Sequence, residues 1–314
     1  MKSCSIIIVN WNSENQLKEC IDSINHTKKT MFIFDKIIIV DNASLDDSLK
    51  NILRPQLEIE IIRNKRNFGF AKACNIGAEN ASSDYLLFLN PDTLLYEDTL
   101  DNLFAVIDEN VDRDVGIYGV QLKDDTGEIQ KTCARFPGVW NFFVRSLGLN
   151  KINSKVFQSY TMHDWDHKIS MVVDEVMGAF FMVKENLFKK LNGFDEDFFV
   201  YYEELDFAKR SFDLGFKAKY VVESQAFHKG GGVSQQVKAK RLFYNLHSRI
   251  IYSFKHFGKF NSIFVMFLTL FVEPFTRLIY LIVKKNKKEI PEILLGYKML
   301  FKKSPSMIRR AFSK

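Results

Sequence analysis

The sequence predicts an α/β fold in which helices flank a mostly parallel β-sheet. Within the first hundred residues, three apolar segments each end on polar side chains, and helical segments separate them. Uninterrupted apolar runs are typical of parallel strands buried on both faces, and strands that alternate with helices are typical of βαβ units. We expect these strands at residues 5–9, 36–40 and 85–89.

The first two expected strands end on amide and carboxylate side chains. The first delivers Asn10-Trp11-Asn12-Ser13, with Ser13 as the expected N-cap of a helix that runs to about Ile24. The second delivers Asp41-Asn42-Ala43-Ser44. In open α/β sheets, ligands bind just beyond the carboxyl ends of the strands, so we expect a ligand at this edge.

The third expected strand ends on Asn90-Pro91-Asp92. A carboxylate at a strand end is well placed to hold a divalent cation against a diphosphate. Taken alone, the segment also fits a strand followed by a turn without chemistry, but the recurrence of polar strand ends favours a binding site. A Gly-rich dinucleotide fingerprint is missing from the sequence, so a nicotinamide or flavin enzyme is disfavoured.

The composition fits one large α/β domain with an extension. The chain has 314 residues, of which 46% are hydrophobic and 26% charged, as is ordinary for a protein with a packed core. Its four cysteines have no paired short spacing, so neither a zinc site nor a disulfide framework is expected. Met1-Lys2-Ser3 leads directly into the first expected strand without a signal peptide, and we interpret this start as that of a cytoplasmic protein.

Charge is distributed unevenly along the chain. Residues 238–314 hold 17 Lys and Arg against 3 Asp and Glu, whereas residues 1–237 hold 27 against 35. A basic segment of this kind suits nucleic acid or an anionic membrane surface. Because the segment is rich in Phe, Leu and Ile and carries no recognised nucleic-acid motif, the membrane is the better interpretation.

An apolar stretch at residues 260–283 reaches the length of a membrane span. Glu273 and Arg277 interrupt it, and an ionisable group inside a bilayer is costly, so a true span is disfavoured. We expect a helix in the membrane interface, with its apolar face in the lipid and four lysines on anionic headgroups; packing on protein is the alternative. The lysines are Lys284, Lys285, Lys287 and Lys288, and the expected polar stripe is Ser262, Thr269, Glu273, Thr276, Arg277, Tyr280 and Lys284.

Six segments of the chain match known motifs in sequence and in order. They read IIIVNWNS, IIIVDNASLDDS, NKRNFGFAKACNIG, YLLFLNPDT, VMGAFFMVKENLFKKLNGFDEDFFVYYEELDFAKR and FHKGGGVS. Through them the chain resembles the family 2 glycosyltransferases of the GT-A fold, and within that family a bacterial rhamnosyltransferase-like branch that builds surface polysaccharides. The resemblance runs from about Ser3 to about Gly258.

The resemblance implies a divalent metal, Mg²⁺ or Mn²⁺, held by Asp92 and His228. The family's Asp-x-Asp corner stands here as Asn90-Pro91-Asp92, so Asp92 is the one anionic ligand expected there. A histidine by itself is more often a surface or core residue, but the motif favours His228 as a ligand. It precedes Gly230-Gly231-Gly232, a run flexible enough to close over phosphates.

The resemblance also implies a general base in the Glu203-Glu204 pair. Glu204 takes the position that abstracts the acceptor proton in a single inverting displacement, with Glu203 beside it. Without the resemblance, two acidic residues at a helix start are ordinary, because negative charge suits the helix dipole there. Asp206 is expected to support the loop rather than the chemistry.

The nucleotide sugar is expected at the first two strand ends and in the loop that follows. The resemblance implies that Asp41 contacts the base and ribose, and Trp11 packs either on the base or in the core. Arg66 and Lys72 are expected to frame the phosphates or the sugar, with a solvated turn as the alternative for Arg66. The expected donor-binding residues are Asn10, Trp11, Asn12, Asp41, Asn42, Arg66, Asn67, Gly69, Lys72 and Asn90.

The sequence thus predicts a nucleotide-sugar-binding half at 1–120, an acceptor and catalytic half of the same GT-A domain at 121–258, and a basic, apolar helical membrane-associating tail at 259–314. The expected activity is metal-dependent, inverting transfer of a sugar, with L-rhamnose as the preferred candidate, from a dTDP- or UDP-linked donor. The expected acceptor is a lipid-linked glycan or polysaccharide in bacterial cell-surface glycan synthesis, such as O-antigen or capsule. We expect a protein peripheral on the inner face of the cell membrane, without a nucleic-acid partner.

Two alternatives to this activity remain open in the sequence. The first keeps the fold and uses a UDP-hexose as the donor. The second is a sugar nucleotidyltransferase, which is less favoured because its Gly-rich phosphate loop is absent after the first expected strand.

Overall fold

The computed structural model describes residues 1–314 except 51, 53–56, 110–113, 154–155, 231–236 and 314. The chain forms two compact units, which we call the sheet unit and the helical unit. The sheet unit comprises Met1–Arg135, Trp165–Glu196 and Glu203–Val233, and the helical unit comprises Phe136–Asp164, Asp197–Tyr202 and Ser234–Lys314. The functional division predicted at residues 120 and 258 stays a prediction.

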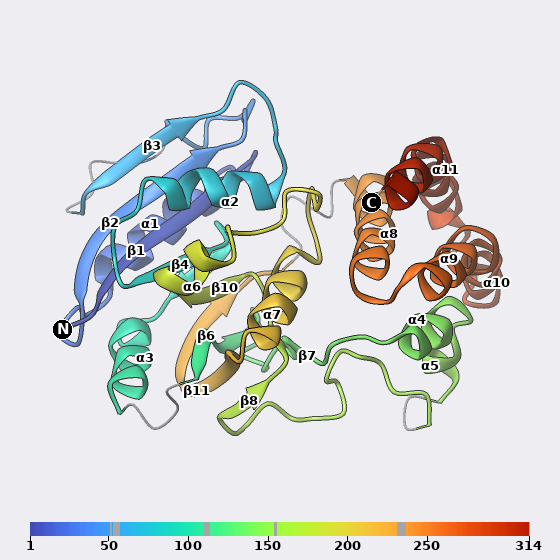
Figure 1. The fold of residues 1–314 in the computed structure, drawn as a ribbon. Coiled ribbons are helices and arrows are strands. Elements are labelled where there is room, and N and C mark those ends of the chain that lie inside the picture. The colour runs from blue at the N-terminus through green and yellow to red at the C-terminus, as the bar shows by residue number, and fades with distance from the viewer. Residues whose placement is uncertain (51, 53–56, 110–113, 154–155, 231–236, 314) are drawn as a thin grey trace. The chain divides into compact units, whose positions relative to one another are not determined.

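Among the described residues, nine strands of the sheet unit form one mixed sheet (Figure 1). The strands are β1 (Ser3–Asn10), β2 (Ile33–Asp41), β3 (Ile59–Arg63), β4 (Tyr85–Leu89), β5 (Thr93–Leu95), β6 (Val115–Lys123), β8 (Met171–Val173), β10 (Phe180–Lys184) and β11 (Lys217–His228), while β7 (Cys133–Ala134) pairs separately with β9 (Glu175–Val176). Their order is β3-β2-β1-β4-β10-β6-β11-β5, and β8 pairs with β11. The first four strands of this order and the pair β6–β11 are parallel, whereas β10, β5 and β8 run antiparallel to their neighbours.

Helices cover both faces of this sheet, as the sequence predicts (Figure 1). They are α1 (Gln16–His26), α2 (Phe70–Glu79), α3 (Thr99–Asp108), α6 (Glu185–Lys190) and α7 (Glu203–Asp213). Ile6 and Ile8 of β1 pack in one buried cluster with Leu17 of α1. Gly77 of α2 lies against Ile7, where a Cβ atom would come within 2.5 Å of Ile7 Cγ2. Because successive strand residues face opposite sides, α1 and α2 lie on opposite faces of the sheet.

The pairing of β5 with β11 sets the position of Asp92. In its antiparallel register, Thr93 lies opposite His228. The backbone N–H of Lys229 donates to the carbonyl oxygen of Asp92 at 3.1 Å. Two residues far apart in the sequence, Asp92 and His228, are therefore brought together by backbone hydrogen bonds alone.

The helix predicted after the first strand is present, but it does not begin where predicted. Its first residue is Gln16, and Asn15 occupies the N-cap position. The hydroxyl of Ser13 donates instead to the side-chain oxygen of Asn10. The predicted cap at Ser13 is wrong because the strand end engages that hydroxyl. The acidic pair Glu203-Glu204 stands at the start of a helix, Glu203–Asp213.

Helices make up the regular structure of the helical unit in the described residues. They are α4 (Val139–Ser146), α5 (Leu149–Ile152), α8 (Lys238–His256), α9 (Lys259–Phe267), the π-helical turn η2 (Leu268–Val272), α10 (Glu273–Val283), the 3₁₀ turn η3 (Lys287–Glu289) and α11 (Ile290–Ser313). Leu246 and Ile250 of α8 form a buried cluster with Leu270, Tyr297 and Leu300. The segment after residue 258 therefore shares an apolar core with α8, and a chain cut there would expose that core.

The stretch Lys259–Val283 packs through its polar side. Ser262 and Thr269, two members of the predicted polar stripe, are 0% exposed. The hydroxyl of Ser262 donates to the carbonyl oxygen of Ser253 at 2.6 Å. Large apolar side chains, among them Phe267 and Phe275, face outward. Length and composition alone would let this stretch cross a membrane, and 33% of its most apolar window is buried inside the protein.

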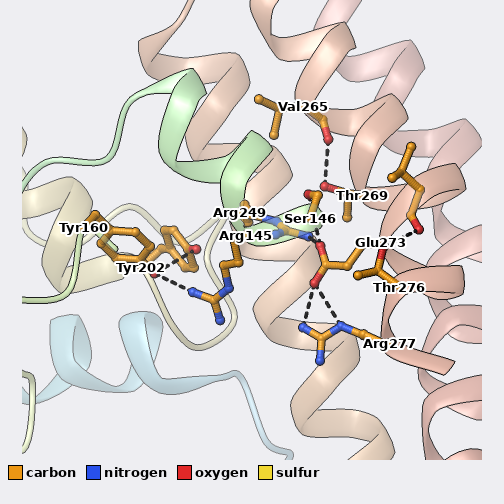
Figure 2. A network of polar contacts seen from close by, with 11 residues as sticks. Arg145, Ser146, Tyr160, Tyr202, Arg249, Val265, Thr269, Glu273, Thr276 and Arg277 are labelled. Carbon is orange, nitrogen blue, oxygen red and sulfur yellow. Dashed lines mark hydrogen bonds and ion pairs between the residues drawn. The ribbon is translucent and has the colours of Figure 1, made fainter. Parts of the chain in front are cut away.

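Glu273 holds three helices of the helical unit together (Figure 2). Its carboxylate pairs with Arg249 of α8 and accepts two bonds, at 2.9 and 2.6 Å, from Arg277 of its own helix. The hydroxyl of Ser146 in α4 lies 3.4 Å from the same carboxylate. Burial alone would raise the pKa of Glu273, but the neighbouring guanidinium groups outweigh it and lower the pKa to about 2.

Replacement of Glu273 by Gln should lower the free energy of unfolding at pH 7 by about 3 to 5 kcal/mol, since it leaves buried arginine charge uncompensated. A group whose folded pKa is depressed stabilises the protein above its unfolded pKa and loses that effect as pH falls. The difference between wild type and Glu273→Gln should therefore shrink as pH falls from about 4.5 towards 2. Denaturant unfolding at pH 7 and pH 3 measures it.

The matched control is Glu289→Gln, which removes a carboxylate paired with Lys238 on the surface of the same unit. It should cost at most about 1 kcal/mol. Equal losses for the two variants would contradict the role given to Glu273.

Candidate functional site

The ends of β1 and β2 are joined by side-chain hydrogen bonds. The amide nitrogen of Asn10 donates to Asp41 Oδ1 at 2.8 Å and to the hydroxyl of Ser48 at 2.9 Å. Asn10 and Asp41 are nearly fully buried, with exposures of 0% and 5%. Next to them the backbone turns through left-handed conformations at Asn12 and Ala43, which is unusual for an alanine. This corner is a hydrogen-bonded polar cluster at the carboxyl edge of the sheet.

Asn12 and Trp11 differ in what they do at this corner. The side-chain oxygen of Asn12 accepts the backbone N–H of Leu45 at 2.7 Å, and its backbone N–H donates to Ser44 Oγ at 3.0 Å. Asn12 thus holds the loop that follows β2. Trp11 is partly exposed rather than part of the buried core.

Asn42 fixes the loop that precedes α2. Its amide nitrogen donates to the carbonyl oxygen of Gly69 at 2.9 Å, and its side-chain oxygen accepts from Asn64 at 2.9 Å. Asn67 in turn accepts the backbone N–H of Gly69 at 2.8 Å, and Gly69 adopts a φ of 90° that favours glycine. Asn42, Asn67 and Gly69 thus fix the backbone conformation of this loop.

Two basic side chains of the predicted donor site lie on or next to this loop. Arg66 is exposed, and its guanidinium lies 5.0 Å from the ring centre of Phe68. Lys72 forms an ion pair of 2.7 Å with Glu196. Arg66 is therefore the more available of the two for a phosphate group.

Asp92 and His228 face each other where β5 begins and β11 ends. Nε2 of His228 lies 3.6 Å from Asp92 Oδ1, and both side chains are largely buried, with exposures of 8% and 12% respectively. Gln130 donates to the carbonyl oxygen of His228 at 2.7 Å, so its side-chain oxygen is left to accept from His228 Nδ1 at 2.8 Å. This network assigns the proton of the neutral ring to Nδ1 and leaves a lone pair on Nε2, facing the carboxylate.

A divalent cation fits between these two side chains. Metal-binding histidines commonly donate their second ring N–H to a fixed acceptor, as His228 does to Gln130. Among the described residues, no group of three or more His, Cys, Asp and Glu gathers to hold a metal unaided. The remaining ligands would be phosphate oxygens and water, the arrangement that Mg²⁺ prefers. Asn90 contributes backbone contacts here, because its N–H donates to the carbonyl oxygen of Ala179 at 3.0 Å.

The glycine run that follows His228 is only partly described. Gly230 has a left-handed φ of 70°. Gly231 and Gly232 lie outside the described residues, and so does the predicted closure of this run over phosphates.

Three carboxylates gather at the start of α7. Burial raises the pKa of Glu204, and the backbone N–H groups of Glu204 and Gly178 partly offset it. Burial, followed by the charge of Glu204, raises the pKa of Glu203 and also that of Glu175 on β9 well above the usual range. Glu203 is 3% exposed, whereas Glu204 is partly exposed. Glu204 is therefore the more exposed member of the predicted pair, and a raised pKa makes a carboxylate a stronger base.

The backbone immediately before this cluster is strained. Tyr201 and Tyr202 have φ values of 69° and 72°, a left-handed conformation that costs a bulky residue of the order of 1 to 3 kcal/mol. On the other side, Asp206 pairs with Arg210 at 2.7 Å. Arg210 also donates to the carbonyl oxygens of Leu191 and Gly193. Asp206 thus anchors the helix to the preceding loop.

Comparison with known proteins identifies the family. Residues 5–188 match the description "Glycosyl transferase family 2". The chain belongs to this family. It is similar to "Rhamnosyltransferase WbbL" of Escherichia coli K12, with 27% identity over 277 residues that cover 82% of this chain and 98% of that protein. A "PGL/p-HBAD biosynthesis glycosyltransferase" of Mycobacterium bovis BCG is 39% identical over 37% of this chain and 45% of its own length.

Solved structures place this family 2 chain in the GT-A fold. Staphylococcus aureus TarS 1–349 in complex with UDP-GlcNAc superposes with a TM-score of 0.54 at 17% identity, over 94% of this chain and 79% of that one. "Mannosyltransferase PcManGT from Pyrobaculum calidifontis in complex with GDP-Man and Mn2+" gives a TM-score of 0.52 at 15% identity, over 93% and 73%. The predicted GT-A sheet with its helical extension is thereby confirmed.

The sequence did not single out two residues of this family 2 site. Glu175 is a buried carboxylate with Val173 and Val176 nearby, and the only signal was an acidic residue in an apolar run. Gln130 lies in a segment without a motif, and it becomes visible only through its two hydrogen bonds to His228.

Proposed function

We propose that this glycosyltransferase moves a sugar from a nucleotide-diphosphate donor to an acceptor hydroxyl in a single inverting displacement that requires a divalent cation. The observation that carries the proposal is the pair formed by Asp92 and His228 Nε2 at the carboxyl edge of the sheet. The relatives support it: one structure of the same fold holds UDP-GlcNAc, and another holds GDP-Man and Mn²⁺.

In this proposal, each strand end has one task. Asp92 and His228 hold the cation, and a bound cation would neutralise the charge that develops on the leaving diphosphate. Asp41 accepts hydrogen bonds from the base or ribose; its carboxylate keeps acceptor capacity beyond the bond from Asn10. Arg66, on the exposed loop, meets the phosphates or the sugar.

Glu204 acts as the general base in this proposal. A single displacement requires that the acceptor hydroxyl lose its proton as its oxygen attacks. Glu204 has one carboxylate oxygen held near Gly178 and a second without a hydrogen-bond partner in the described part of the chain. Burial keeps the pKa of this group high, and its negative charge adds to burial in raising the pKa of Glu203 and Glu175.

The preferred donor is dTDP-L-rhamnose, which the name of the E. coli relative supports. A UDP-hexose is the second candidate, supported by the TarS complex with UDP-GlcNAc. A sugar nucleotidyltransferase is not supported by any relative named above. The acceptor in this proposal is a lipid-linked glycan in bacterial surface polysaccharide synthesis.

The helical unit supplies a membrane-docking face in this proposal. Phe267, Phe271, Phe275 and Ile279 are 51%, 53%, 65% and 61% exposed on one helical stretch. Their spacing of four places them on one side of the helix. Lys284 and Lys285 follow directly and suit anionic headgroups. We therefore expect the protein to be peripheral on the inner face of the membrane, where its four free cysteines would stay reduced.

Two variants separate donor binding from chemistry. Asp92→Asn should abolish cation-dependent binding of nucleotide, because it removes the charged ligand. Glu204→Gln should keep that binding and lower transfer about 10²- to 10⁴-fold, the usual contribution of a general base. Calorimetric titration with dTDP and UDP in the presence of Mn²⁺ measures the first effect. Release of nucleotide from dTDP-rhamnose or UDP-hexoses, with prenyl-diphosphate-linked monosaccharides as acceptors, measures the second.

The matched control for the base is Glu203→Gln at the buried neighbouring position. It should retain more transfer than Glu204→Gln. Full activity in excess chelator would contradict the requirement for a divalent cation. Near-normal transfer by Glu204→Gln together with an inactive Glu203→Gln would instead assign the base role to Glu203.

Docking on a membrane can be tested with single substitutions on the exposed face. Phe267→Glu should weaken binding to vesicles rich in phosphatidylglycerol, because it places a charge in the lipid boundary. Phe212→Glu is the matched control, since Phe212 is also 51% exposed but lies on α7 of the sheet unit. Vesicle co-sedimentation measures both. If wild type stayed in solution, or if the two variants lost binding equally, the docking face would be wrong.

A further inference from the structure

The helical unit gathers three arginine side chains around one buried carboxylate, Glu273. Arg145 of α4, Arg249 of α8 and Arg277 of α10 all act electrostatically on Glu273. In the described contacts, Glu273 is the one carboxylate paired with them. Arginine stays protonated in proteins, so one carboxylate faces three fixed positive charges. A buried excess of this size is costly unless an anion joins it.

The tyrosines near this cluster do not supply that anion. Arg145 donates to the hydroxyl of Tyr160 at 3.1 Å, and this hydroxyl lies 3.3 Å from that of Tyr202 (Figure 2). Burial raises the pKa of Tyr202 well above its usual value, so it stays neutral. Nearby, burial and then the charge of Arg277 lower the pKa of Lys151. The shift at Lys151 agrees with an excess of positive charge around the arginines.

Arg249 also has unused hydrogen-bond donors. Its side chain is 1% exposed, and one of its nitrogens pairs with Glu273. Its Nε and Nη1 atoms have no hydrogen-bond partner among the described residues. Unsatisfied buried donors are rare in folded proteins and cost about 1 to 3 kcal/mol each. An oxyanion would satisfy them, and the side chain of Arg277, 31% exposed, gives the cluster an edge open to solvent.

We propose that Arg145, Arg249 and Arg277 bind the phosphate groups of a lipid-linked diphosphate, the acceptor carrier of the proposed function. Guanidinium groups bind phosphate through paired, charge-assisted hydrogen bonds. The helix that carries Arg277 also carries the exposed side chains of Phe275 and Ile279. The charged headgroup of such a lipid suits Arg277, and its hydrocarbon chain suits Phe275 and Ile279. A free phosphate suits only the arginine.

The test uses the full chain and farnesyl diphosphate as the probe. Titrations are made in excess chelator, so that cation-dependent binding of diphosphate at Asp92 does not contribute. Arg145→Gln is the main variant because Arg145 makes none of the direct bonds to Glu273, and the fold should survive its loss. It should weaken binding about 10- to 100-fold, the range expected for one lost charged hydrogen bond. Arg145→Lys should restore part of the affinity.

The control variant is Arg241→Gln, which removes an exposed arginine from α8. Its affinity for farnesyl diphosphate should equal that of wild type. Equal weakening by both variants would mean general electrostatic attraction and would overturn the site. No binding to wild type, or unchanged binding to Arg145→Gln, would leave the arginines as a purely structural network.

Two further probes identify the ligand. Inorganic diphosphate should bind more weakly than farnesyl diphosphate but depend equally on Arg145, and farnesol should not depend on Arg145. If inorganic diphosphate bound as tightly as farnesyl diphosphate, the lipid part of the proposal would be wrong. Binding of dTDP and of UDP with Mn²⁺ is measured on the same proteins: the absence of both from wild type would refute the proposed function while leaving the result at the arginines intact.

Discussion

The antiparallel pairing of β5 with β11 is the constraint on which the candidate site depends. This register sets Thr93 against His228 and so brings the Asp92 carboxylate to within 3.6 Å of a histidine nitrogen. Gln130 then selects the ring form that leaves that nitrogen with a lone pair. The proposed cation site thus depends on backbone hydrogen bonds that are already formed before a nucleotide binds.

The ends of β1 and β2 are also fixed before any ligand binds, in their case by buried contacts between polar side chains. Asn10 and Asp41 lock β1 to β2, and Asn42 fixes the loop before α2 through three bonds. The side-chain amides of Asn10 and Asn42 already bond to other groups of the protein. Their contribution to ligand binding is therefore mainly that they fix the shape of the surrounding backbone. The proposed catalytic side is built differently, with strained tyrosines before α7 and carboxylates crowded in a buried cluster. Strain and crowded charge are typical of functional sites rather than of stabilising ones.

Much of this arrangement could be predicted from the sequence, because apolar runs that end on polar residues specify parallel strands and their edge. The proximity of Asp92 and His228 came from the family resemblance and not from local pattern, since their contact depends on pairing between distant strands. Ser13 was misjudged because its hydroxyl has a nearer acceptor in Asn10. Three members of the predicted polar stripe, Ser262, Thr269 and Glu273, are buried, and local periodicity does not reveal that Glu273 faces Arg249 instead of water. Glu175 and Arg249 are single charged residues in amphipathic or apolar segments, and only tertiary packing shows their surroundings.

The central claim is that Asp92 and His228 bind a divalent cation together with the donor diphosphate. Anomalous scattering from crystals grown with Mn²⁺ and a nucleoside diphosphate tests it directly. The account predicts a manganese peak about 2 Å from a carboxylate oxygen of Asp92 and from His228 Nε2, with diphosphate oxygens completing its coordination. A bound nucleotide with no manganese at this position, or manganese held by other side chains, would contradict it.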